Sequence, residues 1–160
     1  MRNVVLARVD DRLIHGEVVS VWTPSLSANR IVVADDDVAA DKFNSRVIKL
    51  LAPAGVKVNV CTVDEACRNL MKDPVKGENI IVLAKSPITY KRMKDKGLEL
   101  PAVNLGGMGV RDARKPFIKN VACDPDEIQA IKDLIDSGTN VYYQLVPEQQ
   151  VIDAAGYVNK

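Results

Sequence analysis

The sequence predicts an α/β fold of three layers, in which a mostly parallel sheet of six or seven strands carries helices on both faces. Apolar runs of strand length alternate along the chain with segments of helical periodicity, as in repeated strand–helix–strand units. Most connections are short and contain glycine, proline or a helix-capping residue. Residues 79–84 hold four successive large apolar residues, which is typical of a central strand buried on both faces.

The length of 160 residues suits one domain, which we expect to span residues 1–160. A net charge of +1 and scattered basic residues give no indication of nucleic-acid binding. No apolar run approaches the roughly 20 residues that cross a bilayer, and the first residues lack a signal-peptide pattern. We therefore expect a cytoplasmic protein that associates with a membrane only through partners.

The first half of the chain is expected to alternate strands and helices. Strands are predicted at residues 3–9, 30–34 and 56–61, from their β-branched and alternating apolar residues. One helix is predicted at residues 16–27 and another from Asp35 to about residue 51. The second helix should present an apolar face made of Phe43, Val47, Leu50 and Leu51.

The second half continues the same alternation. Strands are predicted at residues 79–84, 101–105 and 140–146, with a short one near Val121 inside an irregular segment. A short helix is expected at about residues 149–154. Three further helices should begin at capping residues that are followed by proline or by acidic residues, namely Thr62, Ser86 and Asp124.

Three consecutive aspartates, Asp35, Asp36 and Asp37, follow the second strand. They most simply cap the next helix, because carboxylates stabilise a helix N-terminus. A metal site is the alternative, but no ligand cluster follows at a recognisable spacing. The first strand–helix loop has no Rossmann glycine triplet, and a Walker P-loop is absent. We therefore expect neither a metal ion nor a cofactor.

The loop after the first strand holds the main candidate site. It contains His15, the only histidine, and near it lie two arginines and two aspartates, Arg8, Arg12, Asp10 and Asp11. Strand-to-helix loops form the edge where ligands bind in open α/β sheets, and helix N-termini suit phosphates. A guanidinium fits phosphate oxygens, and an aspartate at one ring nitrogen leaves the other as a nucleophile. A polar surface or capping role for His15 is the alternative.

Residues 106–109 form a second candidate, the sequence Gly106-Gly107-Met108-Gly109. Glycines allow successive backbone N–H groups to point at one anion. A sharp turn without a ligand is the alternative interpretation.

The three cysteines have no spacing of a disulfide framework or zinc site. Cys61 and Cys67 are expected to be buried. Cys123 precedes a predicted helix start, where a thiolate is stabilised, but no arginine or histidine accompanies it nearby. His15 is therefore the stronger nucleophile candidate.

Five ordered segments carry a family resemblance, namely RVDDRLIHGEV at residues 8–18 followed by Trp22, VVADDDVA at 32–39, APAGVKV at 52–58, KSP at 85–87 and NLGGM at 104–108. They resemble the IIB subunits of the mannose/fructose/sorbose family of the bacterial phosphoenolpyruvate-dependent sugar phosphotransferase system. The resemblance implies a transferase in which His15 accepts a phosphoryl group from a IIA phosphohistidine. The group would pass to a sugar that enters through the IIC and IID membrane subunits.

The resemblance also implies roles for the surrounding residues. Arg12 should hold phosphate oxygens and Asp10, or Asp11 in its place, should orient the His15 ring, with Nδ1 favoured as the phosphorylated nitrogen. Supporting residues would be Asp11, Arg8, Gly106, Gly107 and Met108. Because two proteins must approach His15 in turn, we expect its side chain to be exposed on a flat surface.

Two positions depart from the family pattern. Family members commonly have histidine where Gly109 stands and glutamine where Glu17 stands.

Two alternative functions stay open at this point. One is a small-molecule enzyme that binds a phosphorylated metabolite and uses His15 as general acid or base. The other is a regulatory relative that is phosphorylated without transporting sugar.

Overall fold

The computed structural model describes residues 1–159. Seven of its strands form the main sheet: β1 (Val4–Val9), β2 (Arg30–Ala34), β3 (Lys57–Cys61), β4 (Ile80–Ala84), β5 (Ala102–Leu105), β8 (Asn140–Tyr143) and β9 (Ile152–Asp153). Their order across the sheet is β3-β2-β4-β1-β5-β8-β9, and only the β8–β9 pair is antiparallel. The predicted mostly parallel sheet is confirmed.

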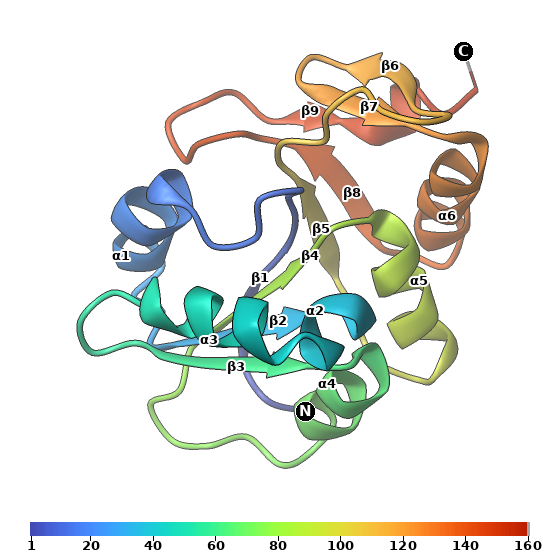
Figure 1. The fold of residues 1–160 in the computed structure, drawn as a ribbon. Helices are drawn as coiled ribbons and strands as arrows, with labels where there is room; N and C mark the ends of the chain where they lie inside the picture. The colour runs from blue at the N-terminus through green and yellow to red at the C-terminus, as the bar shows by residue number, and fades with distance from the viewer. Residues whose placement is uncertain (160) are drawn as a thin grey trace.

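Helices cover both faces of the sheet, as predicted. One face carries α4 (Val63–Leu70), α5 (Pro87–Asp95) and α6 (Pro125–Asp136). The other carries η1 (Val18–Trp22), α1 (Thr23–Ser25), α2 (Asp36–Ala40) and α3 (Lys42–Leu50). Figure 1 shows α1 on one side of the central strands and α5 and α6 on the opposite side.

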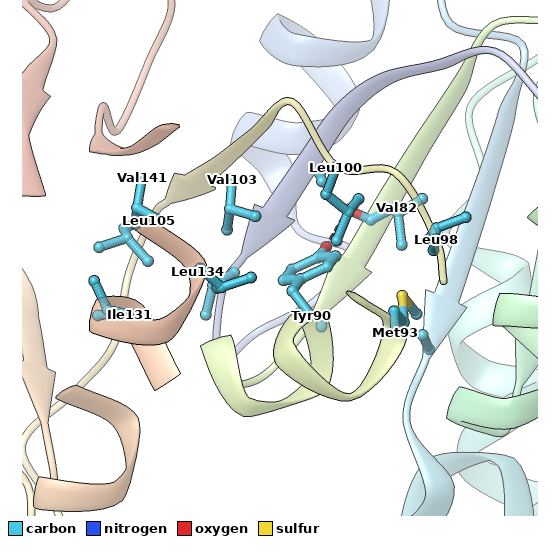
Figure 2. Close-up of a cluster of buried hydrophobic side chains, with 14 of the residues drawn as sticks. Val82, Tyr90, Met93, Leu98, Leu100, Val103, Leu105, Ile131, Leu134 and Val141 are labelled. Carbon is cyan, nitrogen blue, oxygen red and sulfur yellow. Dashed lines mark hydrogen bonds between the residues drawn. The ribbon is translucent and has the colours of Figure 1, made fainter. Parts of the chain in front are cut away.

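The larger core lies between the sheet and the α4–α6 layer. Side chains from α5 and α6, such as Tyr90 and Leu134, meet strand residues such as Val103 (Figure 2). The buried Tyr90 hydroxyl lies 2.8 Å from the carbonyl oxygen of Arg8 and 2.9 Å from that of Val82. This contact ties α5 to the end of β1, directly beside the candidate site.

The predicted helix caps are present. Thr62 with Glu65 and Asp124 with Glu127 form complete capping boxes at the starts of α4 and α6. Ser86 accepts a hydrogen bond from the Ile88 N–H at 3.2 Å. Asp35 likewise accepts from the Val38 N–H at 2.9 Å and so caps α2. The aspartate run therefore begins with a cap, as expected.

The helix predicted over residues 16–27 is present over residues 16–25, but its middle is not a regular α-helix. Val18–Trp22 is a π-helical turn that continues into α1. Pro24 has no N–H to donate, and the Thr23 hydroxyl donates to the Val18 carbonyl oxygen at 2.7 Å. Both features favour the wider turn over a regular α-helix.

The single helix predicted from Asp35 to residue 51 was also wrong. Asp41 is extended (φ −98°, ψ 98°) and divides it into α2 and α3. Its carboxylate accepts from the Asn44 N–H and side-chain amide, so it acts as a second N-cap. The apolar face predicted for this helix points into solvent: its members are all exposed, Phe43, Val47, Leu50 and Leu51.

The C-terminal half agrees with the predictions only in part. The short strand predicted near Val121 is confirmed as β7 (Val121–Cys123), but it pairs with an unpredicted strand, β6 (Lys115–Ile118), in a separate antiparallel hairpin. The helix expected at residues 149–154 is replaced by β9 and a short 3₁₀ turn, Ala154–Gly156. β9 gains ladder hydrogen bonds from β8, which a short isolated helix cannot match.

The topology sets where a site can form. The chain leaving β1 packs on one face through η1, whereas the chains leaving β4 and β5 pack on the other through α5 and α6. Diverging connections open a crevice at the carboxyl ends of the strands. Residues 10–17 and 106–109 both lie at this edge, because β1 and β5 are neighbours.

Candidate functional site

His15 lies against Asp10 in the loop between β1 and η1. Its Nε2 is 2.9 Å from Asp10 Oδ2. Leu13 lies between Asp10 and His15 in the sequence. It is buried and adopts a left-handed conformation (φ 55°). The side chain of His15 is only 10% exposed, so the expected open placement is not observed.

Asp10 is the buried centre of the site. Its Oδ2 also receives the Arg8 guanidinium at 3.1 Å and the Gly107 N–H at 3.4 Å, and its Oδ1 receives the Arg12 N–H at 3.0 Å. Burial acts to raise the pKa of Asp10. Hydrogen bonds from His15 and the Arg12 backbone, with the charges of His15 and Arg8, outweigh it and lower that pKa to about 2. Asp10 is therefore an ionised acceptor at neutral pH.

Arg8 is buried and lies behind Asp10, so it is no direct phosphate ligand in this structure. Its Nη1 donates to Asn104 Oδ1 at 2.6 Å, and its guanidinium also reaches the carbonyl oxygens of Gln144 and Leu145. The guanidinium carbon lies 5.3 Å from the centre of the Trp22 ring. Arg8 thus pairs with Asp10 on the side away from solvent, which fits a supporting role and not a phosphate-binding one.

The glycine segment 106–109 does not form the expected anion nest in this structure, because protein acceptors take its N–H groups. The Gly106 N–H donates to the Val9 carbonyl oxygen at 2.8 Å, and the Met108 N–H to that of Asn120 at 3.1 Å. The Gly109 N–H donates to Asp11 Oδ2 at 2.7 Å. The segment is bound to the β1 loop and not presented to a ligand.

Gly106 has a specific steric role. A Cβ built on it would lie 2.4 Å from Arg8 Nη2 and 2.5 Å from the guanidinium carbon. The guanidinium therefore lies flat against the Gly106 backbone, an approach that only glycine allows. At Gly107 a Cβ would come no nearer than 3.7 Å to Asp10 Oδ1, an ordinary contact.

Asp11 belongs to a second ion-pair network, which sequence analysis missed. Arg114 Nη1 reaches both carboxylate oxygens of Asp11, at 2.9 and 3.0 Å, and its Nε reaches Glu127 Oε1 at 2.8 Å. Glu127 in turn accepts from the Ser86 hydroxyl at 2.8 Å. Asp11 therefore anchors the loop and does not orient His15.

Arg12 is an accessible cationic group beside Asp10. Its side chain is 58% exposed, and its Nε is 3.7 Å from Asp10 Oδ1. An open cavity of about 480 Å³ adjoins it. The lining residues are Asp10, Asp11, Arg12, Glu17, Gly107, Met108, Gly109, Asn120 and Leu145. Arg12 is thus accessible from solvent, and its contact with an incoming anion stays a prediction.

The second ring nitrogen of His15 is covered. Nδ1 is buried and makes no hydrogen bond within residues 1–159. Because ionised Asp10 only accepts hydrogen bonds, Nε2 carries a ring proton, and in the neutral form of this ring the lone pair lies on Nδ1. The arrangement therefore orients a ring whose neutral form has one nucleophilic nitrogen, shielded from solvent in this structure.

A family model described as the PTS system sorbose subfamily IIB component matches residues 4–160. The chain belongs to this family. The resemblance carried by the five sequence segments is therefore confirmed, and the fold agrees with it.

Full-length relatives support the assignment. The sorbose-specific EIIB component of Klebsiella pneumoniae is 32% identical over 98% of this chain and 96% of its own length. The fructose-specific EIIB component of Bacillus subtilis (strain 168) is 31% identical over 92% and 90%. The mannose-specific EIIAB component of Escherichia coli (strain K12) is 32% identical, but the match spans only 49% of that protein.

Solved structures agree in fold. The IIBSor domain of the sorbose permease from Klebsiella pneumoniae has a TM-score of 0.91 at 32% identity, over 98% of this chain and 96% of that one. The N-acetylgalactosamine-specific IIB component 1 from Escherichia coli has a TM-score of 0.87 at 28% identity, over 94% and 98%. No helix within residues 1–159 of this IIB component is long and apolar enough to cross a membrane.

The two departures from the IIB pattern fall beside the cavity. A Cβ on Gly109 would lie 3.6 Å from Asp11 Oδ2, so the backbone also accepts a larger residue there. Glu17 lines the cavity, and its Oε2 is buried without a hydrogen-bond partner in the described part of the chain. Neither departure disturbs the contact between His15 and Asp10.

The cysteines are poor nucleophiles in this IIB component. Cys123 is buried, and burial together with the charge of Glu127 raises its pKa to about 12. Burial likewise raises the pKa of Cys61 and of Cys67, although Cys61 is only half-buried, contrary to expectation. All three therefore stay as thiols at neutral pH.

Proposed function

We propose that this IIB component is a phosphocarrier that accepts a phosphoryl group on His15 and donates it to a sugar. The observation that carries the proposal is the 2.9 Å contact from His15 Nε2 to ionised Asp10, which leaves Nδ1 as the nucleophile. The neutral thiols favour His15 over a cysteine as the acceptor.

The chemical step requires little beyond positioning. The Nδ1 lone pair attacks the phosphorus of a donor phosphohistidine, and the donor P–N bond breaks with its electron pair returning to the donor ring. The ring of His15 gains positive charge, which Asp10 stabilises through the Nε2 proton. Arg12 neutralises the phosphoryl oxygens. Transfer between two histidines is close to thermoneutral.

Transfer also requires that Nδ1 become accessible. Asp11, Leu13 and Ile14 hold the loop to the rest of the protein, so the movement must be local to the His15 side chain and the groups that cover it. We infer that a docking partner exposes Nδ1 by turning the ring or displacing these covering groups.

The proposed partners follow from the family. The donor is a IIA protein or domain, in keeping with the longer EIIAB relative. The acceptor is a sugar carried by IIC and IID membrane subunits, so the domain at residues 1–160 would work in the cytoplasm, at the membrane surface. This makes the chain a protein-phosphohistidine–sugar phosphotransferase.

The test is the intact mass of the protein after incubation with phosphoenolpyruvate, the general phosphotransferase proteins and a matching IIA. We expect one phosphoryl group that is stable in alkali and lost in acid. His15→Ala should carry none, whereas Cys123→Ala should be phosphorylated like the unmodified chain. A phosphate retained by His15→Ala would contradict the proposal.

A second assay separates carrier from regulator. Addition of membranes that contain IIC and IID together with their sugar should discharge the phosphorylated protein. Phosphorylation without sugar-dependent discharge would favour the regulatory alternative. Absence of phosphorylation with a competent IIA would favour the metabolite enzyme.

A further inference from the structure

Helix α3 and its C-cap Leu51 carry an apolar face that points into solvent. Phe43, Val47, Leu50 and Leu51 follow the spacing i, i+4, i+7 and i+8, which places them on one face. Phe43 is 73% exposed and Leu50 is 78% exposed. We call these four residues the α3 stripe.

The opposite face of α3 provides its attachment to the protein. Ser45 and Ile48 are the only residues of α3 that are half-buried, and Ile48 packs against the core beneath η1 and α2. At 3.6 residues per turn, Ile48 lies about 140° around the helix from Phe43. The α3 stripe therefore faces solvent and makes no part of the core.

All charges within α3 are positive. Lys42, Arg46 and Lys49 are exposed and lie along one flank of the stripe. Three of the four preceding acids are engaged elsewhere, since Asp35 and Asp41 cap helices and Asp36 pairs with Arg92. The remaining acid, Asp37, is exposed one turn before the helix begins.

We propose that the α3 stripe and its basic flank bind an anionic lipid surface. A helix with Phe and Leu on one face and Lys and Arg beside them is suited to lie in the headgroup region, with the apolar side chains inserted. Three cations and four apolar side chains, on a helix of nine residues and its C-cap Leu51, predict weak, reversible binding.

A lipid surface fits these residues better than the other occupants. A second copy packed antiparallel on the same stripe would place the basic flank of one α3 against that of the other. Cytoplasmic loops of membrane proteins are themselves enriched in Lys and Arg, so they would repel this flank. Anionic headgroups carry the complementary charge.

Lipid binding and phosphoryl transfer use separate parts of the molecule. α3 packs on β3, the outer strand, whereas His15 follows β1, three strands further along the sheet. With strands about 4.8 Å apart, this separates them by about 14 Å within the sheet. The inference therefore stands independently of the proposed phosphocarrier function.

The test is flotation of the full chain with vesicles of phosphatidylcholine alone or with about 40% phosphatidylglycerol, at millimolar lipid and low salt. We expect binding only to the anionic vesicles, and loss of binding at high salt. The variant Phe43→Ser/Leu50→Ser should lose insertion. Arg46→Gln/Lys49→Gln should weaken binding, by about fivefold for each charge removed.

Matched controls come from the exposed loop at residues 72–77. Val75→Ser removes an exposed apolar side chain, and Lys72→Gln/Lys76→Gln removes two exposed charges, both outside α3. They should bind like the unmodified chain. Every variant should retain its thermal midpoint and its phosphorylation by IIA, which separates this test from that of the proposed function.

Insertion of α3 into the lipid can be measured separately, by fluorescence quenching. In the variant Phe43→Trp the new indole should be quenched by brominated lipids, whereas Trp22 is buried in the core and should not be. Absence of binding to anionic vesicles, or binding unchanged by both α3 variants, would overturn the proposal. So would a dimer, detected by sedimentation, that Leu50→Ser abolishes.

Discussion

Asp10 determines the chemistry of the residues on either side of it. Towards solvent it holds Nε2 of His15, and towards the core it holds Arg8. An ionised carboxylate in a buried position is costly unless paired, and these contacts supply the pairing. The same charge then selects the tautomer of His15, so stability and nucleophilicity depend on one carboxylate.

The charge of Asp10 should appear in the pH dependence of stability. Its pKa is lowered from 3.8 to about 2 in the folded state, so the charged form favours folding above pH 4. This stabilisation should be lost as the pH falls from about 4 to 2. Asp10→Asn should therefore lower the free energy of unfolding by about 2 kcal/mol at neutral pH.

The measurement is urea unfolding of both proteins from pH 7 downwards, in which the difference should shrink below pH 4. A difference that stays constant with pH would show that packing, and not charge, is responsible. The same variant should slow phosphorylation by IIA roughly 100-fold, because the ring loses its fixed orientation.

Gly106 and Gly107 should respond differently to the same substitution. Gly106→Ala places a methyl group 2.4 Å from Arg8 Nη2, so the guanidinium must leave Asp10. We expect a loss of about 2 kcal/mol in the free energy of unfolding, with slower phosphorylation. Gly107→Ala should be tolerated. Thermal unfolding of the pair tests this, and equal effects would refute the steric explanation.

Among the residues of the candidate site, the local sequence pattern reveals His15 and Asp10 but not the residues that hold them in place. His15 and Asp10 are five positions apart, so a local motif reveals them. Arg8 alternates with its neighbours along β1, but nothing local shows that it turns inward to Asn104, 96 positions away. The contacts of Arg114 and Glu127 are likewise not revealed by a local sequence pattern, because their partners come from other segments of the chain.

Among the secondary-structure elements, the β6–β7 hairpin is joined to α6 and the β1 loop by Arg114. Its guanidinium is buried between Asp11 and Glu127, and Glu127 also closes the capping box of α6. Burial acts to lower the pKa of Arg114, but its hydrogen bonds to Glu127 and Asp11 raise it overall. One side chain therefore fixes three elements around the site.

Removal of this side chain should be costly. Arg114→Met leaves the buried Glu127 carboxylate without its main partner, and we expect a loss of about 3 kcal/mol in the free energy of unfolding. Arg111 is exposed and lies 3.4 Å from Asp11, so Arg111→Met should cost little. Chemical denaturation of both variants checks this, and similar losses would contradict it.

The secondary-structure elements differ in whether a local sequence pattern predicts them. Strands β1 to β5 and β8 and the caps at Thr62, Ser86 and Asp124 follow from local patterns, and the structure confirms them. β9 forms only because β8 is beside it, which no local pattern reveals. The stripe of α3 shows why periodicity predicts a helix but not the direction its apolar face takes.

For the whole molecule, the sheet order brings distant segments to one edge. The loop after β1 and the glycine segment after β5 are about 95 residues apart in sequence but adjacent in space, since these strands pair. The predicted α/β class and the predicted loop position were sufficient to place the site at this edge. They were insufficient to predict how deeply the His15 ring would lie.

Under the proposed function, the covered Nδ1 makes phosphorylation selective for the donor. A small phosphoryl donor such as acetyl phosphate makes no docking contacts that could uncover Nδ1, so the nitrogen should stay shielded from it. Folded protein should therefore react with acetyl phosphate far more slowly than a peptide of residues 8–18, as phosphorus NMR would show. Equal rates would mean that Nδ1 is freely accessible. With Nδ1 covered, stray metabolites would leave the protein unphosphorylated, and its phosphoryl group would report only on the protein that delivered it.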